Sequence, residues 1–299
     1  MPGHWTDGLT RIDAPSGALA QRAREAGARF PCPKDEIGSA DVSPRGSWVA
    51  TASESGRAAI SYVPDVSPLL WLDMGGFEVR VDEWGEVVAE RAILPDLERA
   101  ARNRERAVAR AKREVTEYIV HNRLGRMWTL TFGHPQFGRA RVIAMVNDFM
   151  QRWRGAEGKP FPYLYVAELH PDGHGWHVHM AVPDWLYAQK HELQKMWGWG
   201  IVQFSARRKG AGSRRDYRRL AGYLTKYFSK DWGDELEPGS HRYERARGFS
   251  PLVVSVRFES RAAALEWLEG LDGYSFAQVW SSEDSLDWCG PPSTVYLSN

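Results

Sequence analysis

The sequence predicts an α+β fold. We expect one antiparallel sheet with a β-α-β-β-α-β core (split βαβ, RRM-like), helices on one face, and a tyrosine-bearing helix after the fourth strand. Three observations predict it. Segments 127–132, 163–169, 176–182 and 201–205 are short and apolar, and 127–132 alternates apolar with polar residues as a half-buried strand does. Apolar residues recur at helical spacing within 139–154 and 184–197. A turn at 171–173 joins the second and third strands, so these should pair as a hairpin.

The region before these strands is less regular. Residues 1–66 are rich in Gly, Pro, Ser and Ala, which indicates a loosely structured arm with short strands such as 48–51. Residues 69–93 should form a hairpin with turns at Gly75-Gly76 and near Gly85. A helix is expected from about Pro95 to Asn122. Its arginine-rich side is explained better by a solvated helix face than by a DNA contact.

The composition is that of a soluble globular protein, with 299 residues, 43% of them hydrophobic and 26% charged. The two cysteines, Cys32 and Cys289, are too few for a four-cysteine zinc site or a disulfide framework, and they suit a reducing compartment. We find no signal pattern and no segment near the ~20 apolar residues of a membrane span. The expectation is therefore a cytoplasmic protein without membrane contact.

The net charge of +1 conceals an uneven distribution. Residues 205–230 contain nine basic residues and one acidic residue, whereas residues 231–299 contain five arginines and twelve acidic residues. The basic block is suited to phosphate contacts along a nucleic acid strand. Within the acidic part, only a strand at 252–258 and a helix at 260–270 are expected.

Two histidines on one strand form the first candidate site. In Gly-Trp-His-Val-His-Met-Ala-Val (175–182), His177 and His179 point to one side of the strand, opposite to the apolar residues. If the hairpin pairs Leu169 with Trp176, Glu168 faces His177. Two imidazoles and a carboxylate suit a divalent cation, Mg²⁺ or Mn²⁺. The alternative third ligands are His170 and His174, and the alternative interpretation is a solvated strand face.

The second candidate site is a helix at 214–230. Leu220, Ala221, Leu224 and Phe228 form its apolar stripe, and Tyr223 and Tyr227 lie one turn apart beside that stripe. Each tyrosine is followed three residues later by a lysine, Lys226 or Lys230. The tyrosines fit two interpretations. They are amphipathic residues at the edge of the core, or they are phenolic nucleophiles that form a covalent ester with a metal-polarised phosphate.

The motifs Trp-Thr-Leu-Thr-Phe (128–132), His-Val-His (177–179) and Tyr-Leu-Thr-Lys-Tyr-Phe-Ser-Lys (223–230), in this order, resemble the HUH endonucleases. They are most similar to the replication initiators of rolling-circle plasmids and single-stranded DNA phages. The resemblance covers about residues 96–232. It implies that His177, His179 and Glu168 hold the metal and that Tyr227, ranked slightly ahead of Tyr223, cuts DNA. The lysines Lys230 and Lys226 accompany them.

The resemblance implies an enzyme that nicks one strand of origin DNA, stays joined to the 5′ phosphate through tyrosine, and later rejoins the strand. No P-loop motor motif is visible, so a host helicase and polymerase are expected partners. Two alternatives remain: a relaxase or single-strand transposase with the same chemistry, and a non-catalytic nucleic-acid-binding module. The expected DNA contacts are Arg207, Arg208, Lys209, Arg214, Arg215, Arg218, Thr129 and Thr131.

The expected domain organisation has three parts. Residues 1–95 are an N-terminal arm and hairpin, residues 96–232 are the nuclease domain, and residues 233–299 are an acidic C-terminal extension packed on the nuclease domain.

Overall fold

The computed structural model describes residues 46–64, 71–73, 77–81, 87–92, 96–136, 138–170, 175–205, 212–229, 242–285 and 292–298. The chain divides into two compact units, one formed by residues 102–251 and the other by residues 1–101 and 252–299. The division at 95/96 and 232/233 that the sequence suggests stays a prediction. Most of the expected arm, residues 1–45, and the expected turns at 75–76 and 85 lie outside the described residues.

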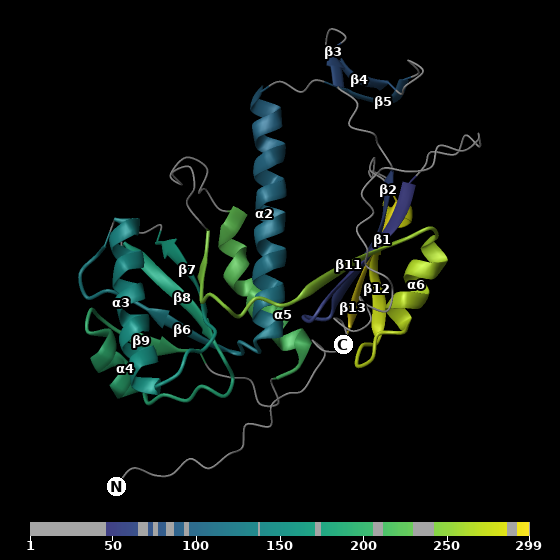
Figure 1. Ribbon diagram of the computed structural model, residues 1–299. Coiled ribbons are helices and arrows are strands. Elements are labelled where there is room, and N and C mark those ends of the chain that lie inside the picture. Colours follow the sequence, from purple (N-terminus) through teal and green to yellow (C-terminus); the bar gives the residue numbers. More distant parts are fainter. Residues whose placement is uncertain are drawn as a thin grey trace. The chain divides into compact units, whose positions relative to one another are not determined.

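The unit of residues 102–251 is built on an antiparallel sheet with the strand order β10-β7-β8-β6-β9 (Figure 1). Its elements follow the predicted β-α-β-β-α-β order, so the α+β fold is confirmed. The strands are β6 (Arg126–Leu130), β7 (Leu164–Leu169), β8 (Trp176–Val182), β9 (Val202–Phe204) and β10 (Glu244–Arg245). The helices are α3 (Arg139–Glu157), α4 (Lys190–Trp197), α5 (Arg214–Thr225) and most of α2 (Asp96–His121).

One face of this sheet packs against α3 and α4. Trp128 and Val178 project from the sheet into a core that contains Phe149, Trp153 and Trp197 from the two helices, all of them 2% exposed or less. The rings of Trp128 and Trp153 stack with their centroids 4.6 Å apart. Because aromatic side chains bury the most apolar surface per residue, this cluster is the main stabilising core of the unit.

The opposite face is also covered, which corrects the expectation of helices on one face only. Val166 of β7 and Ala181 of β8 pack with Leu224 of α5 and with Tyr118 and Ile119 of α2 in a second core. The apolar stripe predicted for α5 explains this arrangement, because such a stripe must be buried against another surface. The histidine-bearing face is therefore open only beyond the area that α2 and α5 cover.

Two helix boundaries differ from the prediction. The helix expected from Asp184 begins at Lys190, and Asp184 instead accepts a 2.6 Å hydrogen bond from the Tyr217 hydroxyl. The helix expected at 214–230 is α-helical only to Thr225 and continues as a 3₁₀ helix, η1 (Lys226–Ser229). The Tyr217–Asp184 bond attaches α5 to the segment that follows β8.

The other unit contains a five-stranded antiparallel sheet, ordered β11-β1-β2-β13-β12, and helix α6 (Arg261–Glu269). The sequence did not predict the pairing between strands so distant in the chain. Ala50, Ile60 and Val256 pack under Trp267 and Leu268 of α6. The strands are β1 (Gly46–Ser53), β2 (Arg57–Pro64), β11 (Val253–Phe258), β12 (Phe276–Ser281) and β13 (Ser293–Ser298), and the 3₁₀ helix η2 is Ser282–Asp284.

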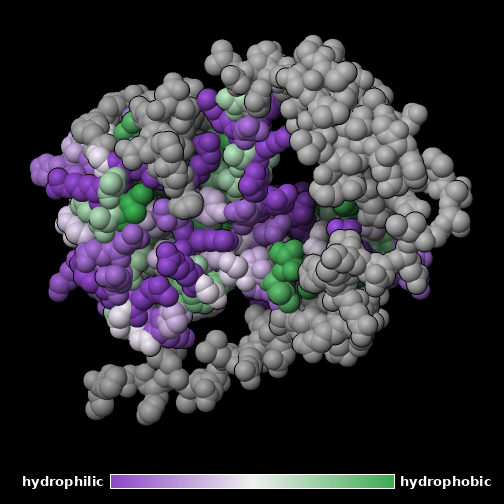
Figure 2. Space-filling view, turned by 45° about the horizontal axis from the view of Figure 1, so that its top comes forward, coloured by the Kyte–Doolittle hydropathy of each residue, from purple (hydrophilic) through white to green (hydrophobic). Residues whose placement is uncertain are grey.

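The expected hairpin at 69–93 is a three-stranded antiparallel sheet. It is ordered β3 (Trp71–Asp73), β4 (Phe77–Val81) and β5 (Val87–Ala92). In Figure 2 the coloured surface of the described residues is mainly hydrophilic, with separate apolar spots. None of the helices in the described part of the chain is both long enough and apolar enough to cross a membrane.

Candidate functional site

The candidate site is built on the β7–β8 hairpin. Leu169 pairs with Trp176 and Glu168 pairs with His177, which is the predicted register. Gly175 closes the hairpin at φ 77°, and a Cβ atom there would lie 2.7 Å from the carbonyl oxygen of Gln136. Only glycine fits this backbone without strain. The hairpin therefore sets Glu168 and both histidines on the same face of the sheet.

His179 is held on both sides of its ring. Its Nε2 lies 2.9 Å from Oε2 of Glu168, and its Nδ1 lies 3.1 Å from Oγ1 of Thr129 on β6. The residue is 7% exposed. Burial lowers the pKa of His179, although the Glu168 carboxylate acts in the opposite direction. The ring orientation is fixed by these two contacts.

Tyr223 on α5 lies against this histidine. The two rings meet edge to face at 90°, with centroids 6.1 Å apart. Tyr223 is 39% exposed, and the ammonium of Lys226 lies 4.0 Å from its ring centroid. A cation at this distance over an aromatic face is attracted by the ring quadrupole. The phenol, a lysine, an imidazole and a carboxylate thus form one continuous cluster, which we call the tyrosine–histidine cluster (Tyr223, Lys226, His179, Glu168).

The position of α5 follows from its own sequence. Ser213 caps the helix: its hydroxyl donates to the Asp216 carboxylate at 2.7 Å and accepts from the Asp216 backbone N–H at 3.2 Å. The bond from the Ser213 hydroxyl is the main cause of the lowered pKa of Asp216. Ala221 and Leu224 on the same helix are buried against the sheet. Tyr223 is therefore directed toward the edge of the sheet area that α5 covers.

His177 has a different neighbour. Its ring lies 5.2 Å from the ring of His170, centroid to centroid, and is tilted by 42°. Among the described residues, no group of three or more His, Cys, Asp or Glu side chains is arranged to hold a metal ion. Glu168 and His179 are in contact, and His177 is in register with Glu168. Two of the three predicted ligands are therefore together, and the metal remains a prediction.

The remaining predicted residues divide into three groups. Thr129 contacts His179, whereas the hydroxyl of Thr131 donates to the carbonyl of Ile201 at 3.1 Å. On α5, Arg214, Arg215 and Arg218 lie in the first two turns, and burial is the main cause of the lowered pKa of Arg218. The backbone of Tyr227 lies in η1, and its side chain is outside the described part of the structure. His174, Arg207, Arg208, Lys209 and Lys230 also lie outside it.

The sequence predicts that Thr129 contacts DNA, and the structure adds a second role, as the hydrogen-bond partner of His179. A signal was present. Thr129 alternates with apolar Trp128 and Leu130, so it had to share a face with histidines on a paired strand.

Residues 125–232 match the family described as replication-associated protein ORF2/G2P. This segment is similar to replication-associated proteins. It begins one residue before β6 and ends after η1, so it contains the whole tyrosine–histidine cluster. The comparisons with curated proteins and with solved structures gave no match.

Proposed function

We propose that this chain initiates rolling-circle replication by nicking one strand of origin DNA through a tyrosine. The observation that supports this most directly is the contact between Tyr223 and His179, with Glu168 on the other side of the histidine. The similarity of residues 125–232 to replication-associated proteins agrees with it. On the strength of this contact we take Tyr223 as the nucleophile, and the choice of Tyr227 from the sequence stays a prediction.

In the proposed reaction, the phenolic oxygen of Tyr223 attacks the scissile phosphorus. The bond from phosphorus to the 3′ oxygen breaks, the phenol loses its proton, and the departing 3′ oxygen gains one. The 5′ phosphate stays on the tyrosine, so the phosphodiester energy is conserved for rejoining. The ammonium of Lys226, beside the ring, is suited to balance the negative charge that develops on the phenol. The free 3′ hydroxyl would be extended by a host polymerase with a host helicase.

A divalent cation, Mg²⁺ or Mn²⁺, belongs to the proposal. Glu168 and His179, with His177 as the third ligand, would hold it, and when bound it would neutralise charge on the scissile phosphate. The 2.9 Å contact between Glu168 and His179 brings oxygen and nitrogen donors together, which agrees with part of this ligand set. Thr129 would orient His179, because its hydroxyl can donate to or accept from Nδ1 in either tautomer.

The test is covalent adduct formation with a pool of single-stranded oligonucleotides of random sequence in the presence of Mn²⁺. We expect a protein–DNA adduct with the natural chain and its loss in Tyr223→Phe, or in Tyr223→Phe with Tyr227→Phe if both tyrosines act. Tyr62→Phe, a change at a tyrosine on β2 in the other unit, serves as the matched control and should keep the adduct.

Mass spectrometry of the adduct names the tyrosine. DNA binding by the natural chain without any adduct, with either metal, would favour the non-catalytic module instead. An adduct that survives in the double tyrosine variant would refute the nucleophile assignment.

A further inference from the structure

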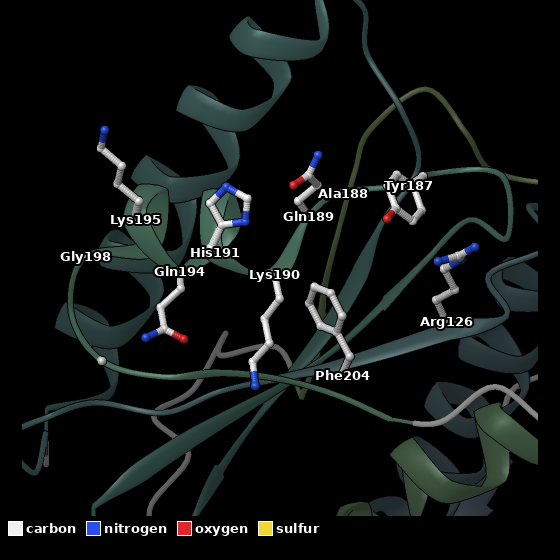
Figure 3. Close-up of a pocket in the computed structure, with 11 residues that line it drawn as sticks. Arg126, Tyr187, Ala188, Gln189, Lys190, His191, Gln194, Lys195, Gly198 and Phe204 are labelled. Carbon is white, nitrogen blue, oxygen red and sulfur yellow. The ribbon is translucent and has the colours of Figure 1, made fainter.

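A second candidate site lies on the opposite face of the same sheet. An open groove of about 870 Å³ runs beside α4 and the edge strand β9 (Figure 3). Volumes of this size are typical of ligand sites. The described lining residues are Arg126, Tyr187, Ala188, Gln189, Lys190, His191, Gln194, Lys195, Gly198, Gly200 and Phe204.

The groove cannot belong to the tyrosine–histidine cluster because of the strand geometry. Arg126 and Trp128 of β6 point to the side covered by α3 and α4, whereas Thr129 points to His179. Side chains two residues apart on a strand share a face, and neighbours point to opposite faces. Phe204 stacks on Trp128 with ring centroids 5.1 Å apart, so it also lies on the α4 side.

The charge of the groove is uniform. Arg126 from β6 and Lys190 and Lys195 from α4 contribute cationic side chains, and no carboxylate is among the described residues that line it. The labelled side chains of Lys190 and Arg126 come from different elements, α4 and β6, and both line the groove (Figure 3). Cations that line the same groove attract a polyanion, such as a chain of phosphates.

Aromatic rings lie among these cations. Phe204 is 38% exposed, and Tyr187 is 72% exposed. Phe204 is stacked on Trp128 from behind, which leaves its outer surface available and fixes the plane of its ring. Cations that follow a phosphate backbone, combined with rings on which bases stack, are the general means of binding single-stranded nucleic acid. An acidic peptide would use the cations but would have no use for an ordered aromatic platform.

We infer that this groove binds a single-stranded DNA segment that flanks the cleaved site, with phosphates on Lys190, Lys195 and Arg126 and a base on Phe204. The assignment of DNA as the ligand rests on the proposed function, whereas the description of the groove does not depend on that function. The strand would pass the edge of the sheet at β9, so one DNA molecule would contact both faces.

The test compares two variants with the same change in charge. Lys190→Gln with Lys195→Gln removes two groove cations, and Arg141→Gln with Arg247→Gln removes two exposed cations that do not line the groove. Binding of long and short oligo-dT is measured by fluorescence anisotropy at several salt concentrations. We expect the groove variant to bind the long oligonucleotide about tenfold more weakly, and its salt slope to fall by about 1.4, since each phosphate contact on a single strand contributes about 0.7. The control pair should stay within about twofold of the natural chain.

A second measurement locates the strand. Oligo-dT with a photoreactive 5-iodouracil should cross-link to Phe204 or Tyr187, and the variants should keep their thermal unfolding temperature. Equal affinity of the groove and control variants, or competition by polyglutamate as strong as by unlabelled oligo-dT, would overturn the inference. A natural chain that forms no covalent adduct would refute the nicking proposal, but the anisotropy result would still decide about the groove.

Discussion

Replacing Thr129 by valine tests whether the orientation of His179 matters to the site. Valine has nearly the same shape as threonine and suits a strand, but it lacks the hydroxyl that lies 3.1 Å from Nδ1 of His179. Thr129 pairs directly with His179 across β6 and β8, so the backbone should not move. The substitution therefore removes one hydrogen bond and little else.

The expected size follows from that single bond. A typical intramolecular hydrogen bond contributes about 0.5–1.5 kcal/mol to the free energy of unfolding. In a unit of this size that corresponds to a decrease of about 1–6 °C in the unfolding temperature. Loss of the partner that orients a metal-binding histidine typically costs about 10–100-fold in activity or metal affinity. We expect the rate of adduct formation to fall within that range.

The assay is differential scanning fluorimetry together with the time course of the adduct in Mn²⁺. Thr129→Ser is the control, because it keeps the hydroxyl and should retain both the unfolding temperature and the rate to within about twofold. If the valine and serine variants behave alike in both measurements, the hydroxyl does not orient His179 and the reasoning is wrong.

Two further predictions concern stability. Burial lowers the pKa of His179 from its ordinary value of 6.5, so below that pH the unfolded chain binds a proton more readily than the folded chain. The free energy of unfolding should therefore fall as the pH decreases below 6.5. Urea titrations at several pH values should show this slope, and His179→Gln should reduce it; an unchanged slope would contradict the assignment. Gly200→Ala should destabilise the unit by about 1–3 kcal/mol, because the new Cβ would lie 2.7 Å from the backbone nitrogen of Gly133 and press on the carbonyl of Thr131. Gly133→Ala should be tolerated in the same urea titrations, since its nearest contact would be 3.6 Å, and equal losses in both variants would argue against a steric cause.

The sequence predicts the hairpin well because its information is local. A short turn fixes the register of two adjacent strands, and that register pairs Glu168 with His177. The apolar stripe at 220–228 is likewise a property of one helical segment, and Ala221, Leu224 and Phe228 are buried as expected. Features that depend on fewer than about twenty consecutive residues can be predicted, because the side-chain periodicity of a single strand or helix determines them.

Helix patterns alone do not predict that helices cover both faces of the sheet. The sequence of β7, however, does indicate burial on both faces. Leu164, Tyr165, Val166 and Ala167 are four consecutive apolar residues, and all are buried. A strand with one solvated face alternates, so an uninterrupted apolar run indicates burial on both sides. The contact between Tyr223 and His179 depends on this covering, because the face that buries α5 is the face that holds His179.

The sheet of the other unit illustrates a different limit. Val49 pairs with Arg257 and with Ser61, and Ser61 pairs in turn with Ser293. The first and last of these partnerships join segments about 200 or more residues apart, and strand patterns contain no information about which distant strands will pair.

The alternating side-chain directions along β6 restrict which insertions and deletions this strand can accept. Trp128 supports Phe204 in the groove, and Thr129, the very next residue, holds His179. Inserting or deleting one residue in this strand would exchange their faces, so that an indole would meet the histidine and a hydroxyl would enter the apolar core. Related sequences should therefore vary here by substitution, while their length between Arg126 and Leu130 stays constant.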